Sequence, residues 1–385
     1  MYSATYPDQD KAFFALLAQT PDLDTRDNRG KKQSMPLVLM GVVMALLAGR
    51  DGNLSAIHRH LKNHFEALCL RLSQQTTNAI SRAQLPRLLA KINHPRLAHL
   101  LQQHYGLELP DEFTQWLSGD GKELRGSIAK GHKRGEALVS IIAQSQNQVV
   151  AQTYYNGAKE SERPSIVNLL TNSGLLNRKI VLDALHFTPK LLDTIHYHQG
   201  RYLVGLKSNQ FTLHRLCLIQ TLLGKSTFER VDAPERGHGR QDQRSYGCYS
   251  LVGLKLAPRW AKSGLMTVVV VTRVRRTLAG VAVGRTVSYF ATNEIVTTQS
   301  DANAVYDAVR GHWQIETMHY QRDVVFSEDD YRSKFMATHR VMSSLRTLVM
   351  RLLYSMKPKN MAAQLNDFAD NVQQLLDFLS LKRVL

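Results

Sequence analysis

Apolar residues in the first hundred positions recur at helical spacing. Residues 36–48 are almost all apolar, and residues 54–72 place an apolar side chain at every third or fourth position, with histidine and lysine between them. Two shorter periodic segments follow at 81–91 and 94–105. Basic residues are dense throughout, so we expect residues 1–108 to form a helical domain that binds DNA, although a solvated basic face would leave the same pattern.

The pattern changes to strands and helices after residue 112. Two β-rich runs at 137–143 and 148–155 are separated by the polar residues 144–147, which predicts a hairpin. We expect further strands at 113–119, 179–185 and 201–207, and helices at 164–170 and 189–198. This order predicts an α/β fold with a mixed sheet that begins with antiparallel strands, and residues 109–210 would form its first part.

Residues 211–285 break this alternation and are predicted to be a β-rich insertion. Strand-like runs at 250–256 and 267–274 follow a loop, 236–244, that is rich in glycine, arginine and histidine. A last strand at 287–291 and helices at 302–310, 314–319 and 337–356 complete the pattern. We therefore expect the core to resume in residues 286–385 and to end in helices.

The net charge narrows the choice of partner. The 385 residues include 49 Lys and Arg against 32 Asp and Glu, a formal charge of +17, which favours a polyanion such as nucleic acid. A soluble protein that is merely basic is the alternative. At 43% hydrophobic and 21% charged residues, the composition is that of an ordinary globular protein.

Cysteine use and hydropathy predict the compartment. The three cysteines lie far apart and form no CxxC or Cys/His cluster, which is typical of a reducing cytosol and argues against a structural zinc site. The polar, acidic N-terminus does not have the pattern of a signal peptide, and the longest apolar run is shorter than the roughly 20 residues that span a bilayer. We expect a cytoplasmic protein with no membrane contact.

Three acidic residues stand at informative places. Asp120 ends a predicted strand, Asp183 interrupts the apolar run KIVLDAL, and Glu316 lies on a predicted helix after the insertion. Acids on two strands and a later helix can meet at one edge of a mixed sheet, where carboxylates suit Mg²⁺ and phosphodiester chemistry. Each acid also has an ordinary explanation: a turn or N-cap for Asp120, a costly but structural carboxylate for Asp183, and a solvated helical residue for Glu316.

Six sequence blocks occur in order along nearly the whole chain. They are DLDTRDNRGKKQSMPLVLMGVVMALLAGRDGNLSAI (22–57), DGKELRGS (120–127), VLDALHFT (181–188), GLKSNQ (205–210), GHGRQDQR (237–244) and VRGHWQIETMHYQRDVVFSED (309–329). Together these blocks resemble the DDE transposases of bacterial insertion sequences, in particular the group of H-repeat-associated proteins.

The resemblance implies an RNase H-like mixed-sheet catalytic core, interrupted by a β-rich insertion and preceded by a helical N-terminal domain. It implies a transposase that cuts transposon ends as an endonuclease and transfers the strands into target DNA. Asp120, Asp183 and Glu316 would be its catalytic, metal-binding triad, with Mg²⁺ as cofactor and Mn²⁺ able to substitute. Double-stranded DNA would be the partner, a homo-oligomer on DNA the working form, and the bacterial nucleoid the location.

Eleven further residues are candidates for DNA contact, because they lie near the acids or in loops that a DNA backbone can approach. They are Lys122, Arg125, His186, Lys207, Asn209, Gln210, His238, Arg240, Arg244, His312 and Trp313. Ordinary alternatives are surface charges for the first two, a structural His186, a solvated loop around Arg240, and a core position for Trp313. The acids Asp323, Glu328 and Asp329 are the substitute for Glu316, or else salt-bridge partners of Arg322 and Arg332.

The chain also departs from the pattern of related transposases. Thr317 follows Glu316 where the group usually has asparagine. Relatives with a Tyr-Arg-Glu-Lys signature have arginine where this chain has His312, and lysine where it has Asp323. Two other functions therefore stay open: a DNA-binding protein derived from a transposase and inactive in transposition, and a metal-dependent DNA nuclease without strand transfer.

Overall fold

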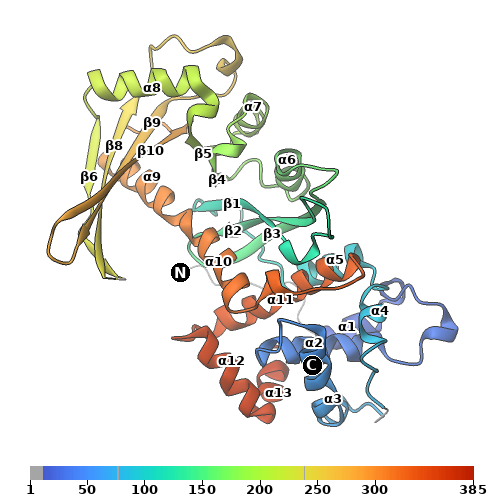
Figure 1. Cartoon of the computed structure of the whole chain (residues 1–385). Helices are drawn as coiled ribbons and strands as arrows, with labels where there is room; N and C mark the ends of the chain where they lie inside the picture. Colours follow the sequence, from blue (N-terminus) through green and yellow to red (C-terminus); the bar gives the residue numbers. More distant parts are fainter. Residues whose placement is uncertain (1–11, 76–77, 238) are drawn as a thin grey trace.

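A computed structural model describes residues 12–75, 78–237 and 239–385. The chain is elongated, with helices at one end, a five-stranded unit in the middle and long strands at the other end (Figure 1). Of the expected site residues, His238 lies outside the described part of the chain. Among the described helices, none combines the length and the apolar character needed to cross a membrane.

The N-terminal helices do not form a core of their own. The helices are α1 (Phe13–Ala18), α2 (Met35–Leu47), α3 (Leu54–Arg71), α4 (Leu85–Leu89) and α5 (His94–Tyr105). Helix α2 is apolar on all sides and buried along almost its whole length, because α1 and α3 cover it together with the C-terminal helices α11 (Ala337–Met356), α12 (Met361–Asp370) and α13 (Val372–Leu381). The first and last parts of the chain therefore share one hydrophobic core.

The middle of the chain has the RNase H-like arrangement. Its strands are β1 (Trp116–Glu123), β2 (Glu136–Ala143), β3 (Gln148–Asn156), β4 (Lys179–Leu182) and β5 (Arg201–Leu206). They are ordered β3-β2-β1-β4-β5, with β1, β4 and β5 parallel and β2 antiparallel to both of its neighbours. The predicted hairpin and the mixed sheet are thus confirmed.

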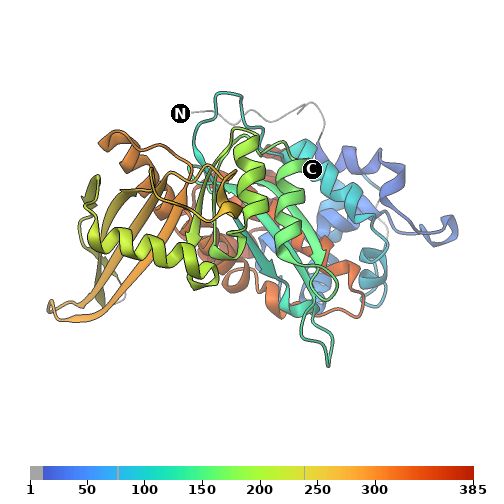
Figure 2. The same cartoon turned by 90° about the horizontal axis from the view of Figure 1, so that it is seen from above.

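Burial on both faces explains the apolar strands. Ile180 and Leu182 of β4 pack towards α6 (Glu162–Asn172) and α7 (Pro189–Tyr197), while Val181 packs towards α9 (Gln299–Gly311) on the other face. Figure 2 shows α6, α7 and α8 (Phe211–Leu223) side by side on one face of the sheet.

The insertion extends the same sheet rather than forming a separate one. Its strands are β6 (Phe228–Val231), β7 (Glu235–Gly237), β8 (Arg240–Ser250), β9 (Thr267–Thr277) and β10 (Ala282–Thr292). Strand β10 pairs with β9 on one side and with β5 on the other, so the expected boundary at residue 285 falls inside one continuous strand.

Two local predictions in this region are wrong. Residues 236–244 are predicted to be a loop, but β7 pairs with the start of β8 there. Of residues 250–256, predicted to be a strand, only Ser250 lies in one, as the last residue of β8. The reason is that Asp242 of β8 forms ion pairs with Arg273 and Arg275 of β9, so charged residues stabilise a strand that has few apolar ones.

Candidate active site

Asp120 lies on β1, and Asp183 directly follows the adjacent parallel strand β4. Gly119 of β1 pairs with Leu182 of β4, and each acid directly follows its member of that pair. Strand β4 ends at Leu182, so Asp183 is not inside a strand; it caps the short helix η4 (Ala184–His186), and its Oδ1 accepts a hydrogen bond from the Leu185 N–H at 3.0 Å. The apolar strand thus delivers Asp183 to the edge of the sheet next to Asp120.

Glu316 lies near Asp120 on a helix and not on a strand. It lies in the first turn of α10 (Trp313–Val324), which packs on β1, and one turn later Nδ1 of His319 lies 3.4 Å from Oδ2 of Asp120. Although Glu316 is exposed, the surrounding protein removes enough water to raise the pKa of its carboxyl, and the charge of Asp120 raises that pKa further. His319 and Lys207 act on it in the opposite direction. Asp183 and Glu316 therefore both lie close enough to Asp120 for its charge to affect them.

The charges at this edge repel one another. Burial raises the pKa of Asp183 above its ordinary value, and the charges of Asp120 and Glu162 raise it further, against the opposing effects of His186 and the Leu185 N–H. A carboxylate that is disfavoured by its neighbours is stabilised by a divalent cation, since Mg²⁺ and Mn²⁺ prefer oxygen ligands.

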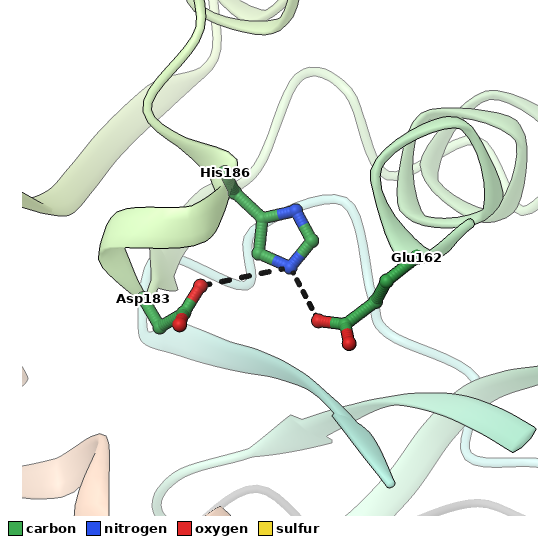
Figure 3. Close-up of side chains that lie close together, drawn as sticks. All are labelled: Glu162, Asp183 and His186. Carbon is green, nitrogen blue, oxygen red and sulfur yellow. Dashed lines mark hydrogen bonds and ion pairs between the residues drawn. The ribbon is translucent and has the colours of Figure 1, made fainter. Parts of the chain in front are cut away.

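A fourth acid, which the sequence did not single out, completes this edge. Figure 3 shows Glu162, the first residue of α6, and His186 of η4 turned towards each other beside Asp183. Nε2 of His186 lies 2.9 Å from Oε1 of Glu162 and 3.7 Å from Oδ1 of Asp183. One ligand atom from each of the three residues lies within 4.8 Å of the others, a spacing that could hold a metal ion.

Gly121 makes room for Glu162 on β1. A Cβ atom at position 121 would lie only 2.2 Å from Cδ and 2.3 Å from Oε2 of Glu162. The carboxylate thus rests on the backbone directly after Asp120. In the sequence, Glu162 resembles any acid in the first turn of a helix, so no local signal marks its place in the site.

The donor set fits a hard divalent cation. Among the described residues, the side chains spaced closely enough to hold one metal ion are Glu162, Asp183 and His186. Asp120 and Glu316 are outside this group, although the charge of Asp120 acts on the carboxyls of both Asp183 and Glu316. Mg²⁺ usually takes only a few carboxylates and keeps several waters. Nε2 of His186 is engaged by Glu162, so His186 is better placed to orient the carboxylates than to contact DNA. Its side chain is fully buried.

Lys122 is not the surface charge that the sequence suggested. Its side chain is only 6% exposed, and its Nζ lies 2.7 Å from Asp323, 3.0 Å from Asp329 and 3.8 Å from Glu328. Arg125, by contrast, is 75% exposed and has one longer ion pair, of 3.7 Å, with Asp329. Of these two predicted phosphate contacts, only Arg125 is open to a ligand in this structure.

The segment after β5 supports the site from one side. Lys207 is exposed and close enough to Glu316 to influence its pKa. The side chains of Asn209 and Gln210 instead donate hydrogen bonds to the carbonyls of Ala184 (3.0 Å) and Phe187 (2.7 Å). Both amides therefore hold the segment that carries Asp183 and His186.

Two arginines of the insertion and one of α9 gather around Trp313. The guanidinium of Arg244 lies 4.6 Å from the centre of the Trp313 ring, that of Arg310 lies at 5.1 Å, and that of Arg273 at 6.0 Å. Arg244 is buried and also pairs with Glu235, whereas Arg240 is partly exposed and lies 3.8 Å from Asp242. Trp313 is thus packed by cations at the start of α10, three residues before Glu316.

His312 is buried, and the acids Asp323, Glu328 and Asp329 form ion pairs with basic side chains. Burial lowers the pKa of His312, against the opposing charge of Asp120, and its Nδ1 has no hydrogen-bond partner. Glu328 is buried and receives two hydrogen bonds of 2.7 Å from Arg322. Burial alone would raise the pKa of Glu328, but the charge and hydrogen bonds of Arg322 lower it to about 2. Glu328 is therefore a salt-bridge partner of Arg322, as the alternative interpretation expected. Asp323 and Asp329 instead pair with Lys122, and Arg332 donates a hydrogen bond to the backbone carbonyl of Asp329 rather than to its carboxylate.

Several known proteins similar to this chain are described as putative transposases. The family model described as "Transposase DDE domain" matches residues 108–352. The chain is 25% identical over 243 residues to "Putative transposase YncI" of Escherichia coli O157:H7, which covers 62% of this chain and 61% of that protein. It is 24% identical over 240 residues to "H repeat-associated putative transposase YhhI" of Escherichia coli (strain K12), covering 61% of this chain and 62% of that one. The chain thus spans about three fifths of the length of the curated relatives it matches.

A solved structure is similar over most of the chain. It is described as "Cryo-EM structure of piggyBac transposase synaptic complex with hairpin DNA (SNHP)" and aligns with a TM-score of 0.47 at 11% identity. The alignment covers 96% of this chain and 80% of that chain.

Proposed function

The chain belongs to the transposase DDE domain family, and from this premise we propose that it is a DNA transposase that cuts transposon ends and joins them to target DNA. The catalytic residues of the proposal are Asp120, Asp183 and Glu316. The observation that supports it is that Asp120 lies close to Asp183, which directly follows the adjacent parallel strand, and to Glu316, on the helix that packs on β1.

The proposed reaction needs oxygens held around a phosphodiester. A divalent cation bound by these carboxylates would activate the attacking oxygen and stabilise charge on the leaving oxygen. Asp120 lies between the two halves of the site, with Asp183 and Glu162 on one side and Glu316 and His319 on the other. Water and then a DNA 3′-hydroxyl are the proposed nucleophiles, so none of the acids forms a covalent intermediate.

The remaining side chains bind and orient DNA in this proposal. Arg125 and Lys207 are exposed near the acids and are suited to phosphate oxygens. Trp313 and the arginines around it offer an aromatic and cationic surface beside Glu316. Double-stranded DNA as the partner, a homo-oligomer on that DNA, Mg²⁺ or Mn²⁺ as cofactor, and a cytoplasmic, nucleoid-associated location belong to the same proposal.

The test is cleavage of a supercoiled plasmid that carries the ends of the element. Wild type, Asp183→Ala and the control Asp111→Asn, an exposed acid before β1, are compared in Mg²⁺, Mn²⁺ and EDTA. We expect metal-dependent cuts at the ends for wild type and the control, and none for Asp183→Ala. Cuts without joined products would favour a nuclease, and tight binding without cuts in any metal would favour a derived DNA-binding protein.

A further inference from the structure

Two contacts connect β1 with α10: Asp120 with His319, and Lys122 with Asp323. Asp120 and Lys122 are two positions apart on β1, so their side chains leave the same face of the sheet. Glu316 and Asp323 are seven positions apart on α10, which is two helical turns, so they share one face of the helix. Asp120 faces the turn that holds Glu316 and His319, and Lys122 pairs with Asp323 at 2.7 Å.

The Lys122 contact belongs to a larger buried network. Its Nζ also lies 3.0 Å from Asp329 and 3.8 Å from Glu328, and Arg322 binds Glu328 through two nitrogens. Arg322 in turn donates to Ser343 and Thr347 of α11. A buried ammonium is tolerated only when it is paired, and removing one partner leaves a charge without compensation. The network therefore fixes α10 between β1 and α11.

We propose that Lys122 is a positioning residue of the active site. Through Asp323 it sets the register of α10 on β1, and so the separation between the carboxylates of Asp120 and Glu316. The inference rests on the proposed function, because that separation matters only if both acids bind one metal centre. Lys122 itself touches neither substrate nor metal in this role.

The surroundings of Lys122 distinguish this role from phosphate binding. Three carboxylates enclose its Nζ, and a phosphate would have to displace them against their negative charge. Arg125, three residues further along the chain, has the exposure that phosphate binding needs. The two residues are thus a matched pair for experiment.

The experiment measures Mn²⁺ affinity and DNA affinity separately, on the whole protein. Lys122→Met keeps the length of the side chain and removes its charge, and Arg125→Met does the same at the exposed position. Bound Mn²⁺ is followed by electron paramagnetic resonance, and duplex DNA binding by fluorescence anisotropy in EDTA. We expect Lys122→Met to weaken Mn²⁺ binding by about tenfold to a hundredfold, the usual effect of losing a residue that orients metal ligands, with DNA affinity unchanged. We expect Arg125→Met to weaken DNA binding and to leave the Mn²⁺ affinity unchanged.

Asp323→Asn guards against a folding defect in Lys122→Met. It leaves Asp329 and Glu328 to pair with Lys122, and we expect a smaller loss of Mn²⁺ affinity in the same direction. In the double variant the effects should not add, since the two residues act as one unit. Weaker DNA binding by Lys122→Met with unchanged Mn²⁺ affinity would overturn the positioning role alone. No Mn²⁺ binding by wild type would overturn the proposed metal centre and this role together.

Discussion

His186 and Glu162 lie 2.9 Å apart between Nε2 and Oε1, although 24 residues separate them in the sequence; the imidazole is buried and the carboxylate is partly exposed. An ionised carboxylate only accepts hydrogen bonds, so the imidazole directs its Nε2–H at Glu162. The same nitrogen lies 3.7 Å from Oδ1 of Asp183. The imidazole of His186 therefore contacts the carboxylates of both Glu162 and Asp183 and can orient them for the proposed metal centre.

Substitution of Glu162 tests whether this acid belongs to the metal centre. Glu162→Gln keeps the shape and a hydrogen-bond acceptor for His186 but removes the charge. We expect Mn²⁺ affinity and the rate of plasmid cleavage to fall by about tenfold or more, because a carboxylate beside Asp183 is lost. Glu160→Gln, two residues earlier and exposed, should match wild type in the same titration. If Glu162→Gln and Glu160→Gln bind Mn²⁺ with equal affinity, Glu162 is not part of the metal centre.

The repulsion at the site predicts an unusual gain of stability. An acid whose pKa is raised by folding costs stability when it is ionised, that is, at a pH above its folded pKa. The pKa of Asp183 is raised by burial and by Asp120 and Glu162, so Asp183→Asn should stabilise the metal-free protein at pH 8, by about 1–3 °C in Tm. Asparagine can still cap η4.

The pH series supplies the control for that prediction. As the pH falls through the pKa of Asp183, wild type becomes protonated there and the advantage of Asp183→Asn should shrink. Melting curves in EDTA from pH 8 to pH 5 measure this, and saturating Mn²⁺ should reverse the order of the two proteins. A variant that is less stable than wild type at pH 8 in EDTA would contradict the repulsion inferred from the geometry.

The Arg322–Glu328 pair predicts the acid sensitivity of the fold. Arg322 lowers the pKa of Glu328 from 4.5 to about 2, so the pair contributes stability above pH 4.5 that is lost as the pH falls towards 2. Each pKa unit corresponds to about 1.4 kcal/mol, which makes the contribution roughly 3 kcal/mol. Arg322→Met leaves a buried carboxylate unpaired and should cost about 3–5 kcal/mol at pH 7.

Urea unfolding at pH 7 and pH 3 checks this value. The loss caused by Arg322→Met should be smaller at pH 3, where Glu328 is largely protonated in the unfolded chain. Arg332→Met is the matched control. Arg332 is exposed and contacts this network only through a hydrogen bond that it donates to the Asp329 carbonyl. A loss that does not depend on pH would point to packing rather than to charge.

A basic pocket in the helical region predicts part of the DNA contact. Its cavity of about 390 Å³ is lined by Arg50, Arg59, His60, Asn63 and His64 of the segment before α3 and of α3 itself, with Ala56 and Ala369. Each phosphate contact contributes about 0.9 to the slope of log affinity against log salt. Arg50→Gln with Arg59→Gln should therefore lower the slope by about 1.8 and weaken binding to all duplexes alike.

Fluorescence anisotropy over a range of salt concentrations measures that slope. Arg96→Gln is the control, because Arg96 already lies 3.3 Å from Asp22 and has less to offer a phosphate. If the double variant keeps the slope of wild type, Arg50 and Arg59 do not contact DNA phosphates, and DNA binds to another surface.

Local pattern predicted the central strands and singled out Asp183, although the strand ends at Leu182, one residue before this acid. The apolar run KIVLDAL fits a strand that is buried on both faces, and a carboxylate in such a run is costly unless it reaches an edge. The same reasoning failed at residues 236–244, because the strand there depends on Asp242 finding Arg273 and Arg275 some thirty residues later. It also missed Glu162, whose neighbours in the sequence are ordinary helix residues.

By itself the sequence determined the order of strands and helices, the positive charge, and the identity of three acids on elements that can converge. These properties follow from local periodicity and composition, which act over a few residues. Only the tertiary structure decided that Glu162 joins Asp183, that Lys122 is enclosed by carboxylates, and that the first and last helices share a core. The physical reason is that sheet register and helix packing bring together residues that are far apart along the chain, and the spacing of those residues carries no local signal.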